Sequence, residues 1–143
     1  MPSAVTLIRS EELSDVAEYA YAATAPAGSR LIFLAGACPL NADGSTAAVG
    51  DYKGQAAKAI ENLEIALADA GASLTDVVKT TVLVASTRQE HLVAAWQVVR
   101  DTFGDHDAPS TLQGVTVLGY RDQLVEIEAV AAVVDDNPCV GSG

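Results

Sequence analysis

The sequence predicts an α+β domain in which a mixed β-sheet carries two helices on one face. Two observations predict it: short apolar or alternating segments typical of strands, and two longer segments with helical periodicity. The chain has 143 residues, of which 50% are hydrophobic, so one domain can bury its core without disulfides or a metal. We expect this domain at residues 1–134, in the order β-β-α-β-α-β-β, followed by a flexible tail at 135–143.

The first half of the chain supplies two strands and a helix. The strands are predicted at residues 18–24 and 30–36, with a turn-rich linker between them. Residues 31–35 are apolar throughout, which is typical of a strand covered on both faces. The helix is predicted at about 52–70, where apolar residues recur at one-face spacing. Gly71 follows at the place where glycine ends a helix most easily.

The second half repeats the alternation of strand and helix. A strand at about 77–84 is followed by residues 86–89, which have the spacing of a capping box and open the second helix. The last two strands are predicted at about 111–118 and 123–134, joined by a hairpin at 119–122. Each helix then connects parallel neighbouring strands. Two helices cover only one face of the sheet, so we expect an identical subunit to cover the other.

The charge of the chain excludes several classes of partner. It carries 8 Lys and Arg against 19 Asp and Glu, a net charge of -11. Nucleic acids and anionic membrane surfaces attract proteins through Lys and Arg, so neither is an expected partner. No apolar run is long enough to span a membrane, and the N-terminus does not resemble a secretion signal. Cys38 and Cys139 form no disulfide framework. We expect a cytoplasmic protein.

Strict alternation separates the two faces of the last strand. One face is wholly apolar and is expected to lie under the helices, whereas the other carries Glu126 and Glu128, roughly 7 Å apart. These carboxylates fit a solvated edge or an ion pair with Lys79 or Arg121. A structural role of this kind is favoured, although the carboxylates also fit a proton-transferring group that is partly desolvated at a subunit interface. Spacing alone does not choose between these interpretations.

Other chemically capable residues give weaker signals. Cys38 follows the second predicted strand, where a buried apolar thiol is favoured over a nucleophile. His91 and His106 have no Cys or Asp partners at ligand spacing, so no metal site is expected. Trp96 lies on the apolar stripe of the second helix, where packing is favoured, although a helix at a subunit cleft could reach a ligand.

Four segments, in the right order, resemble the RidA/YjgF family, whose members are also labelled endoribonuclease L-PSP. The resemblance runs over about residues 19–134 and is carried by residues 31–40, 55–72, 76–82 and 125–131. It implies a chorismate-mutase-like α+β fold and a homotrimer with three ligand clefts between subunits. It also implies hydrolysis of reactive enamines and imines to keto acids and ammonia, with no metal or organic cofactor.

The resemblance assigns roles to individual residues. It implies that Glu126 positions or activates water, that backbone groups near Gly36 complete the site, and that Tyr19 or Tyr21 borders the cleft. Ser110 stands where the family has an arginine that forks the substrate carboxylate, and Trp96 stands where a polar residue is often found. A serine hydroxyl replaces a bidentate guanidinium only weakly.

Two functions of different classes therefore follow. The first is a cofactor-independent deaminase with an altered substrate, in which Glu126 is the acid/base and Ser110, Gly36 and a tyrosine hold a small-molecule ligand. The second is a protein that binds or sequesters a metabolite without turnover. The ribonuclease activity in the family label is the least favoured, because the chain is acidic and lacks a basic stripe.

Overall fold

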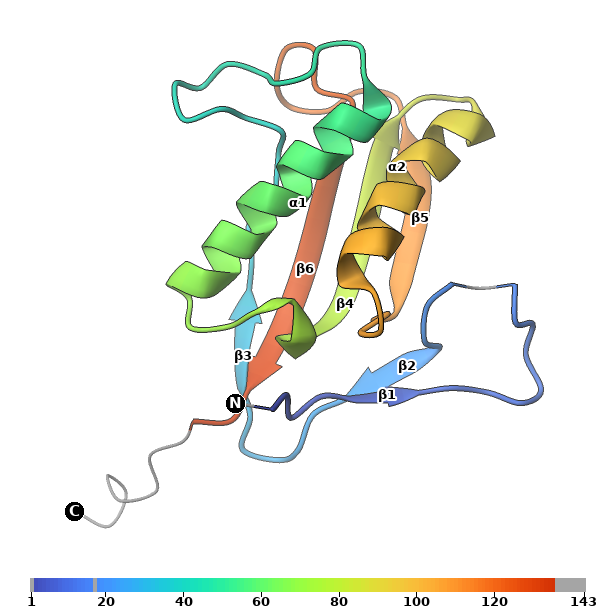
Figure 1. Cartoon of the computed structure of the whole chain (residues 1–143), viewed down its shortest axis with the longest axis vertical. Helices are drawn as coiled ribbons and strands as arrows, with labels where there is room; N and C mark the ends of the chain where they lie inside the picture. Colours follow the sequence, from blue (N-terminus) through green and yellow to red (C-terminus); the bar gives the residue numbers. More distant parts are fainter. Residues whose placement is uncertain (1, 17, 136–143) are drawn as a thin grey trace.

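The computed structural model describes residues 2–16 and 18–135. A four-stranded sheet has the order β3-β6-β4-β5, and α1 and α2 lie side by side on one face of it (Figure 1). Residues 136–143 of the predicted tail lie outside the described part of the chain. The elements of this body are β3 (Arg30–Phe33), α1 (Tyr52–Asp69), a 3-10 helix (Leu74–Asp76), β4 (Val77–Ala85), α2 (Gln89–Phe103), β5 (Ser110–Val115) and β6 (Val125–Val133).

The N-terminal segment forms a separate two-stranded ribbon. β1 (Thr6–Ile8) pairs with β2 (Ala22–Thr24) in an antiparallel arrangement, and the ribbon lies beyond one end of the sheet (Figure 1). The sequence predicted the second strand of this ribbon but not the first, because three residues are too few for alternation to stand out. It also predicted that the chain begins with two strands, whereas three precede α1.

The position of β6 in the sheet differs from the prediction. β6 lies between β3 and β4 and runs antiparallel to both, whereas β5 pairs with β4 in parallel. The predicted hairpin between the last two strands is therefore wrong, since the segment after β5 crosses the end of β4 to reach β6. As predicted, α2 connects parallel neighbours. α1 does not, because β6 separates β3 from β4.

The core lies between the sheet and the two helices. The expected apolar face of β6 is buried, and α1 buries the side chains that its periodicity indicated. Gly71 adopts a positive φ of 83° just after α1, as expected for the residue that follows a helix end. Among the described residues, no helix is long and apolar enough to cross a membrane. The central buried side chains are Val125, Ile127, Ala129 and Ala131 of β6 and Ala56, Ile60, Leu63 and Leu67 of α1.

Two amide side chains of α1 fasten the loops at one end of the sheet. Gln55 is fully buried, and its Nε2 donates to the carbonyl of Asp122 at 2.8 Å while its Oε1 accepts from the N–H of Leu124 at 2.6 Å. Nδ2 of Asn62 donates to the carbonyls of Cys38 and Leu40 at 2.8 and 2.9 Å. The loop after β3 and the loop before β6 are thus both fixed to one helix.

We predict that Gln55→Leu lowers the free energy of unfolding by about 2–4 kcal/mol, because it removes both hydrogen bonds that the fully buried Gln55 side chain makes to the backbone of Asp122 and Leu124. Urea denaturation followed by circular dichroism measures this loss. Gln89→Leu is the matched control, since Gln89 is exposed at the start of α2 and its replacement should change stability by no more than about 0.5 kcal/mol. Equal losses in the two variants would contradict the anchoring role of Gln55.

Candidate functional site

Glu126 lies on the face of β6 that the helices leave uncovered. In the sheet it pairs with Leu83 of β4, and its carboxylate packs against the backbone of Gly36, in the segment after β3. A Cβ built on Gly36 would lie 2.1 Å from Oε2 of Glu126, which is far inside van der Waals contact. Any other residue at position 36 would displace the carboxylate. The structure therefore brings these two predicted site residues together.

Two hydrogen-bond donors converge on the same oxygen of Glu126. The thiol of Cys38 donates to Oε1 at 3.4 Å, and Nε2 of Gln123 donates to Oε1 at 3.1 Å. Gln123 is 4% exposed, and its amide also binds the carbonyl of Val125 and the N–H of Tyr120. Sequence analysis missed Gln123, because a glutamine beside a turn carries no signal until the fold sets it against a carboxylate.

The environment of Cys38 makes its thiol a poor nucleophile. Burial, the nearby charge of Glu126 and the hydrogen bond to it together raise the pKa of this thiol to about 11. At neutral pH the sulfur therefore keeps its proton, whereas a nucleophilic cysteine needs the thiolate. The structure thus favours the interpretation of Cys38 as a structural thiol, here with a specific polar contact.

The aromatic candidates form a second cluster beside α2. The ring of Tyr19 meets those of Tyr21 and Trp96 edge to face, with centroids 6.4 and 5.8 Å apart. Nε1 of Trp96 donates to Glu18 at 3.2 Å, and Arg100 pairs with the same carboxylate at 2.5 Å. The N-terminal segment is thereby attached to α2, and the predicted aromatic site residues lie together.

Ser110 lies on the helix-covered face of the sheet and not with Glu126. It is 9% exposed, and its hydroxyl accepts a hydrogen bond from Thr80 at 2.8 Å. The register pairs Ser110 with Thr80 and Thr80 with Ala129, whose side chain is on the helix-covered face. Because side chains alternate along a strand, Ser110 and Glu126 lie on opposite faces of the sheet. Within one chain they do not face a common space.

The acidic face of β6 makes no ion pair among the described residues. Neither Glu126 nor Glu128 takes part in a salt bridge of residues 2–16 and 18–135. Nζ of Lys79 instead donates to the hydroxyl of Thr111 at 2.7 Å. The ion pair with Lys79 or Arg121 that the sequence allowed is therefore not formed in this part of the chain.

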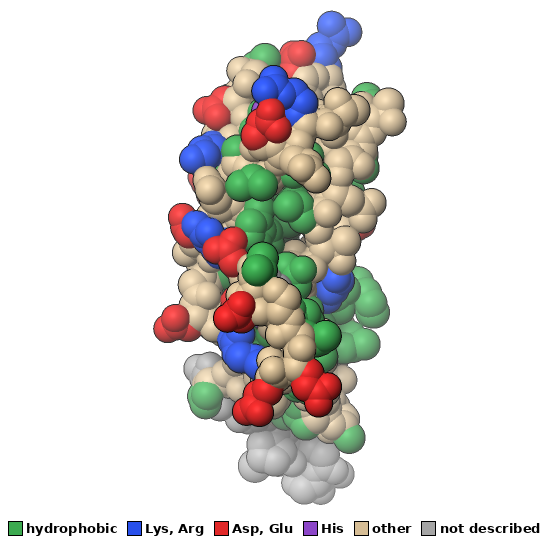
Figure 2. Space-filling view, turned by 90° about the vertical axis from the view of Figure 1, so that its right-hand side faces the viewer, with side chains coloured by type: hydrophobic (Ala, Val, Ile, Leu, Met, Phe, Trp, Pro, Cys, Tyr) green, Lys and Arg blue, Asp and Glu red, His purple; other side chains and the backbone are tan. Residues whose placement is uncertain are grey.

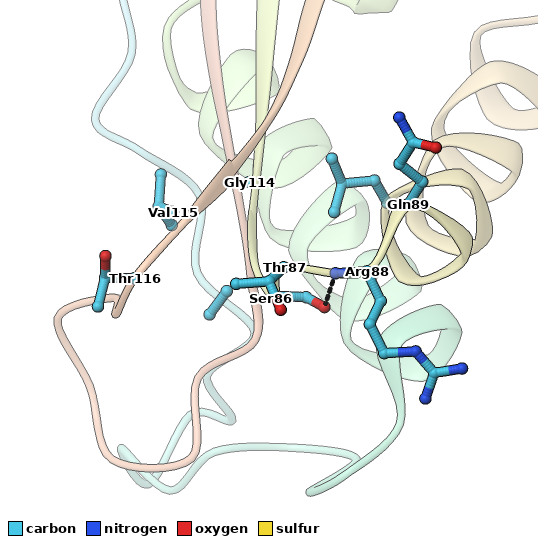
Figure 3. A pocket seen from close by; sticks show the side chains of 9 residues that line it. Ser86, Thr87, Arg88, Gln89, Gly114, Val115 and Thr116 are labelled. Carbon is cyan, nitrogen blue, oxygen red and sulfur yellow. Dashed lines mark hydrogen bonds between the residues drawn. The ribbon is translucent and has the colours of Figure 1, made fainter.

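An open hollow of about 450 Å³ lies where β4 and β5 end and α2 begins (Figure 3). Oγ of Ser86 accepts from the N–H of Arg88 at 3.0 Å and lies 2.7 Å from Nδ1 of His91. Ser86 thus closes the turn before α2 and does not cap the helix as predicted. Arg88 pairs with Glu90 at 2.6 Å, so its charge is already compensated.

The described residues contain no cluster of three or more His, Cys, Asp or Glu side chains that could hold a metal.

Comparisons with known proteins agree on one family. The family model described as endoribonuclease L-PSP matches residues 10–133. A RutC family protein of Pyrococcus abyssi is 35% identical over 100 residues, which cover 70% of this chain and 76% of that protein.

Solved structures give the same result for the fold. The Rid family protein YyfB of Yersinia pestis, a protein of unknown function, superposes with a TM-score of 0.83 at 26% identity, covering 91% of this chain and 99% of that one. A YjgF/YER057c/UK114 family member from Mycobacterium tuberculosis superposes with a TM-score of 0.63 at 29% identity, covering 90% of this chain and 99% of that one. The predicted chorismate-mutase-like α+β fold is thereby confirmed.

We predict that Gly36→Ala destabilises the protein by about 1–3 kcal/mol, because the new methyl group overlaps the Glu126 carboxylate and forces it away from its two donors. The cost should largely disappear in a Glu126→Ala background, where the obstructing atoms are gone, so a double-mutant cycle by urea denaturation measures the contact directly. Gly119→Ala serves as the control, since a Cβ there meets no atom within 4 Å. Additive effects of Gly36→Ala and Glu126→Ala would disprove the contact.

Proposed function

The chain belongs to the endoribonuclease L-PSP family, also known as the RidA/YjgF family, and from this we propose that it is a homotrimer with small-metabolite clefts between its subunits. In those clefts it hydrolyses an enamine or imine to a keto acid and ammonia, without a metal or organic cofactor. The observation that carries this proposal is the half-buried carboxylate of Glu126, held by two donors against Gly36. The altered arginine position at Ser110 makes the substrate different from that of typical members.

The proposed reaction uses Glu126 for all proton transfers. As the oxygen of water bonds to the imine carbon, Glu126 takes one proton from that water. It returns this proton to the nitrogen, which gives a carbinolamine. Glu126 then takes the proton of the new hydroxyl group and passes it to the nitrogen, so the C=O bond forms as the C–N bond breaks and ammonia leaves. Cys38 forms no covalent bond in this scheme, because its raised pKa of about 11 keeps the thiol protonated.

A substrate carboxylate requires a partner other than an arginine at position 110. Arg30 is paired with Asp135 at 3.2 Å, and in the sheet it stands opposite Val133, at the far end of β6 from Glu126. Arg121 is exposed in the loop before β6 and borders an open hollow of about 450 Å³. We therefore assign the carboxylate contact to Arg121, with Ser110 donating its free hydroxyl proton from the other side of the cleft.

The separation of the two clusters supports a ring assembly. A ligand that meets Glu126 and also Ser110, Tyr19 or Trp96 must lie between two chains that present different faces. Contacts between unlike faces are heterologous, and they generate a closed ring when the rotation between subunits closes. A trimer is the smallest such ring in which the Glu126 face of each chain meets the Ser110 side of a neighbouring chain.

Exposed apolar side chains on both faces support the same assembly. On the uncovered face of the sheet, Leu31 is 54% exposed and Phe33 is 75% exposed. A second group of hydrophobic side chains lies on the side of the molecule where α2 and the edge strand β5 are. There it occupies the middle of the surface, with charged side chains above and below it (Figure 2). Apolar patches of this kind mark surfaces that another protein covers.

The described cations support leaving nucleic acid out of the proposal. Five of the eight Lys and Arg side chains, namely Arg9, Arg30, Lys58, Arg88 and Arg100, are paired with carboxylates. Phosphate binding needs unpaired cations on a common surface. The ribonuclease activity in the family label is therefore not part of our proposal. We do propose that the protein is cytoplasmic. The alternative function is a trimer that binds a metabolite without turnover.

We predict about three chain masses in multi-angle light scattering at micromolar concentration, and dissociation of this assembly by Leu31→Glu, because a buried charge opposes the contact. Ile65→Glu is the matched control. Ile65 is also 54% exposed but lies on α1, away from the uncovered face of the sheet, so this variant should stay trimeric. A monomeric wild type would overturn the proposal of a site between subunits.

We predict that wild type accelerates keto-acid release from 2-iminopropanoate or a related imine generated in situ, and that Glu126→Gln lowers kcat by about 100-fold or more, because general acid/base catalysis is worth at least this factor. Glu128→Gln, two residues along the same strand, should keep most of the activity. Ligand binding by wild type without acceleration of any imine would favour the alternative function.

A further inference from the structure

The two oxygens of the Glu126 carboxylate have different surroundings. Oε1 accepts hydrogen bonds from Cys38 and Gln123. Oε2 points to the backbone of Gly36 and accepts no hydrogen bond from the described residues 2–16 and 18–135. Among these residues no fully buried side-chain nitrogen or oxygen lacks a partner, so Oε2 is not fully buried. The carboxylate is therefore held at one oxygen and accessible at the other.

Both donors are themselves held in place. Gln123 uses its full amide, because its Oε1 accepts from the N–H of Tyr120 at 3.0 Å and its Nε2 also contacts the carbonyl of Val125 at 3.1 Å. The carbonyl of Cys38 accepts from Asn62 at 2.8 Å. A rotation of the Gln123 side chain would therefore break its contacts with the backbone of Tyr120 and Val125. The contact with Asn62 fixes the backbone that carries Cys38.

We propose that Cys38 and Gln123 are positioning residues that fix Glu126 by Oε1, so that Oε2 is the oxygen that meets the ligand. This inference rests on the role proposed above for Glu126 and adds the atom that acts and the two side chains that select it. It also explains why a thiol with no nucleophilic role lies in contact with this carboxylate. The only other carboxylate on this strand face, Glu128, has no such donors among the described residues.

The kinetic test compares variants that remove or keep a donor. Cys38→Ala should lower kcat for keto-acid release by about tenfold with little change in KM, since a hydrogen bond to a charged group is worth about that factor. Cys38→Ser should keep most of the activity because the hydroxyl still donates. Gln123→Leu should act like Cys38→Ala, provided that circular dichroism shows it folded. Equal activity of Cys38→Ala and wild type, or failure of Cys38→Ser to exceed Cys38→Ala, would overturn the inference.

A second readout does not depend on turnover. The Cys38 thiol faces the Glu126 carboxylate, the Gln123 amide and the carbonyl of Gly36, and of these only the carboxylate is charged. Glu126→Gln should therefore lower the pKa of this thiol from about 11 part of the way towards its usual value, while burial keeps the rest of the shift. The thiolate absorbance, followed against pH in a Cys139→Ala background after subtraction of the tyrosinate signal of the matching Cys38→Ala, Cys139→Ala variant, measures this shift. If Glu126→Gln lowers the pKa of the Cys38 thiol but the wild type hydrolyses no imine, the positioning contact stands and only the proposed reaction is rejected. An unchanged pKa would reject the contact itself.

Discussion

The central position of β6 is the constraint on which the rest of the structure depends. This strand pairs with β3 on one edge and with β4 on the other, and every second side chain enters the core beneath the helices. It therefore cannot shift by one residue, because the apolar face would turn to solvent and the carboxylates would turn to the core. The same pairing fixes Glu126 on the uncovered face. The location of the acidic group is thus a consequence of how the core is built.

Amide side chains connect this strand to the rest of the candidate site. Gln55 holds the loop before β6, Asn62 holds the segment after β3, and Gln123 joins that loop to Glu126 itself. Each amide satisfies backbone groups that no strand or helix would satisfy, which would otherwise be costly. Because two of the three amides come from α1, the loops around Glu126 are positioned by a helix on the opposite side of the sheet.

Local patterns in the sequence predicted the parts of the fold that depend on local physics. The alternation of apolar and polar residues on β6 predicted correctly which side chains face the helices and which do not. The helical spacing on α1 likewise predicted its buried side, because burial is the main cause of both patterns. The insertion of β6 between β3 and β4 could not be read from the sequence, since it depends on pairing between residues about a hundred positions apart. For the same reason the contact of Gln123 with Glu126 was not predicted, whereas Glu126 and Gly36 were named as candidates through the family resemblance. The position of Ser110 under α2 likewise follows only from its register with Thr80.

The position of Ser110 bears on how the proposed ligand would be held. Ser110 and Thr80 form a compact pair of hydroxyls beneath α2, where they are 9% and 3% exposed. A guanidinium at this position would be largely buried, and a buried, unpaired charge is costly. The serine thus fits its neighbours, and an arginine there would require α2 or the N-terminal segment to lie differently. Glu18, Tyr19 and Arg9 attach that segment to α2 and to Asp107, three residues before Ser110. The N-terminal segment is therefore fixed next to the start of the strand that carries Ser110.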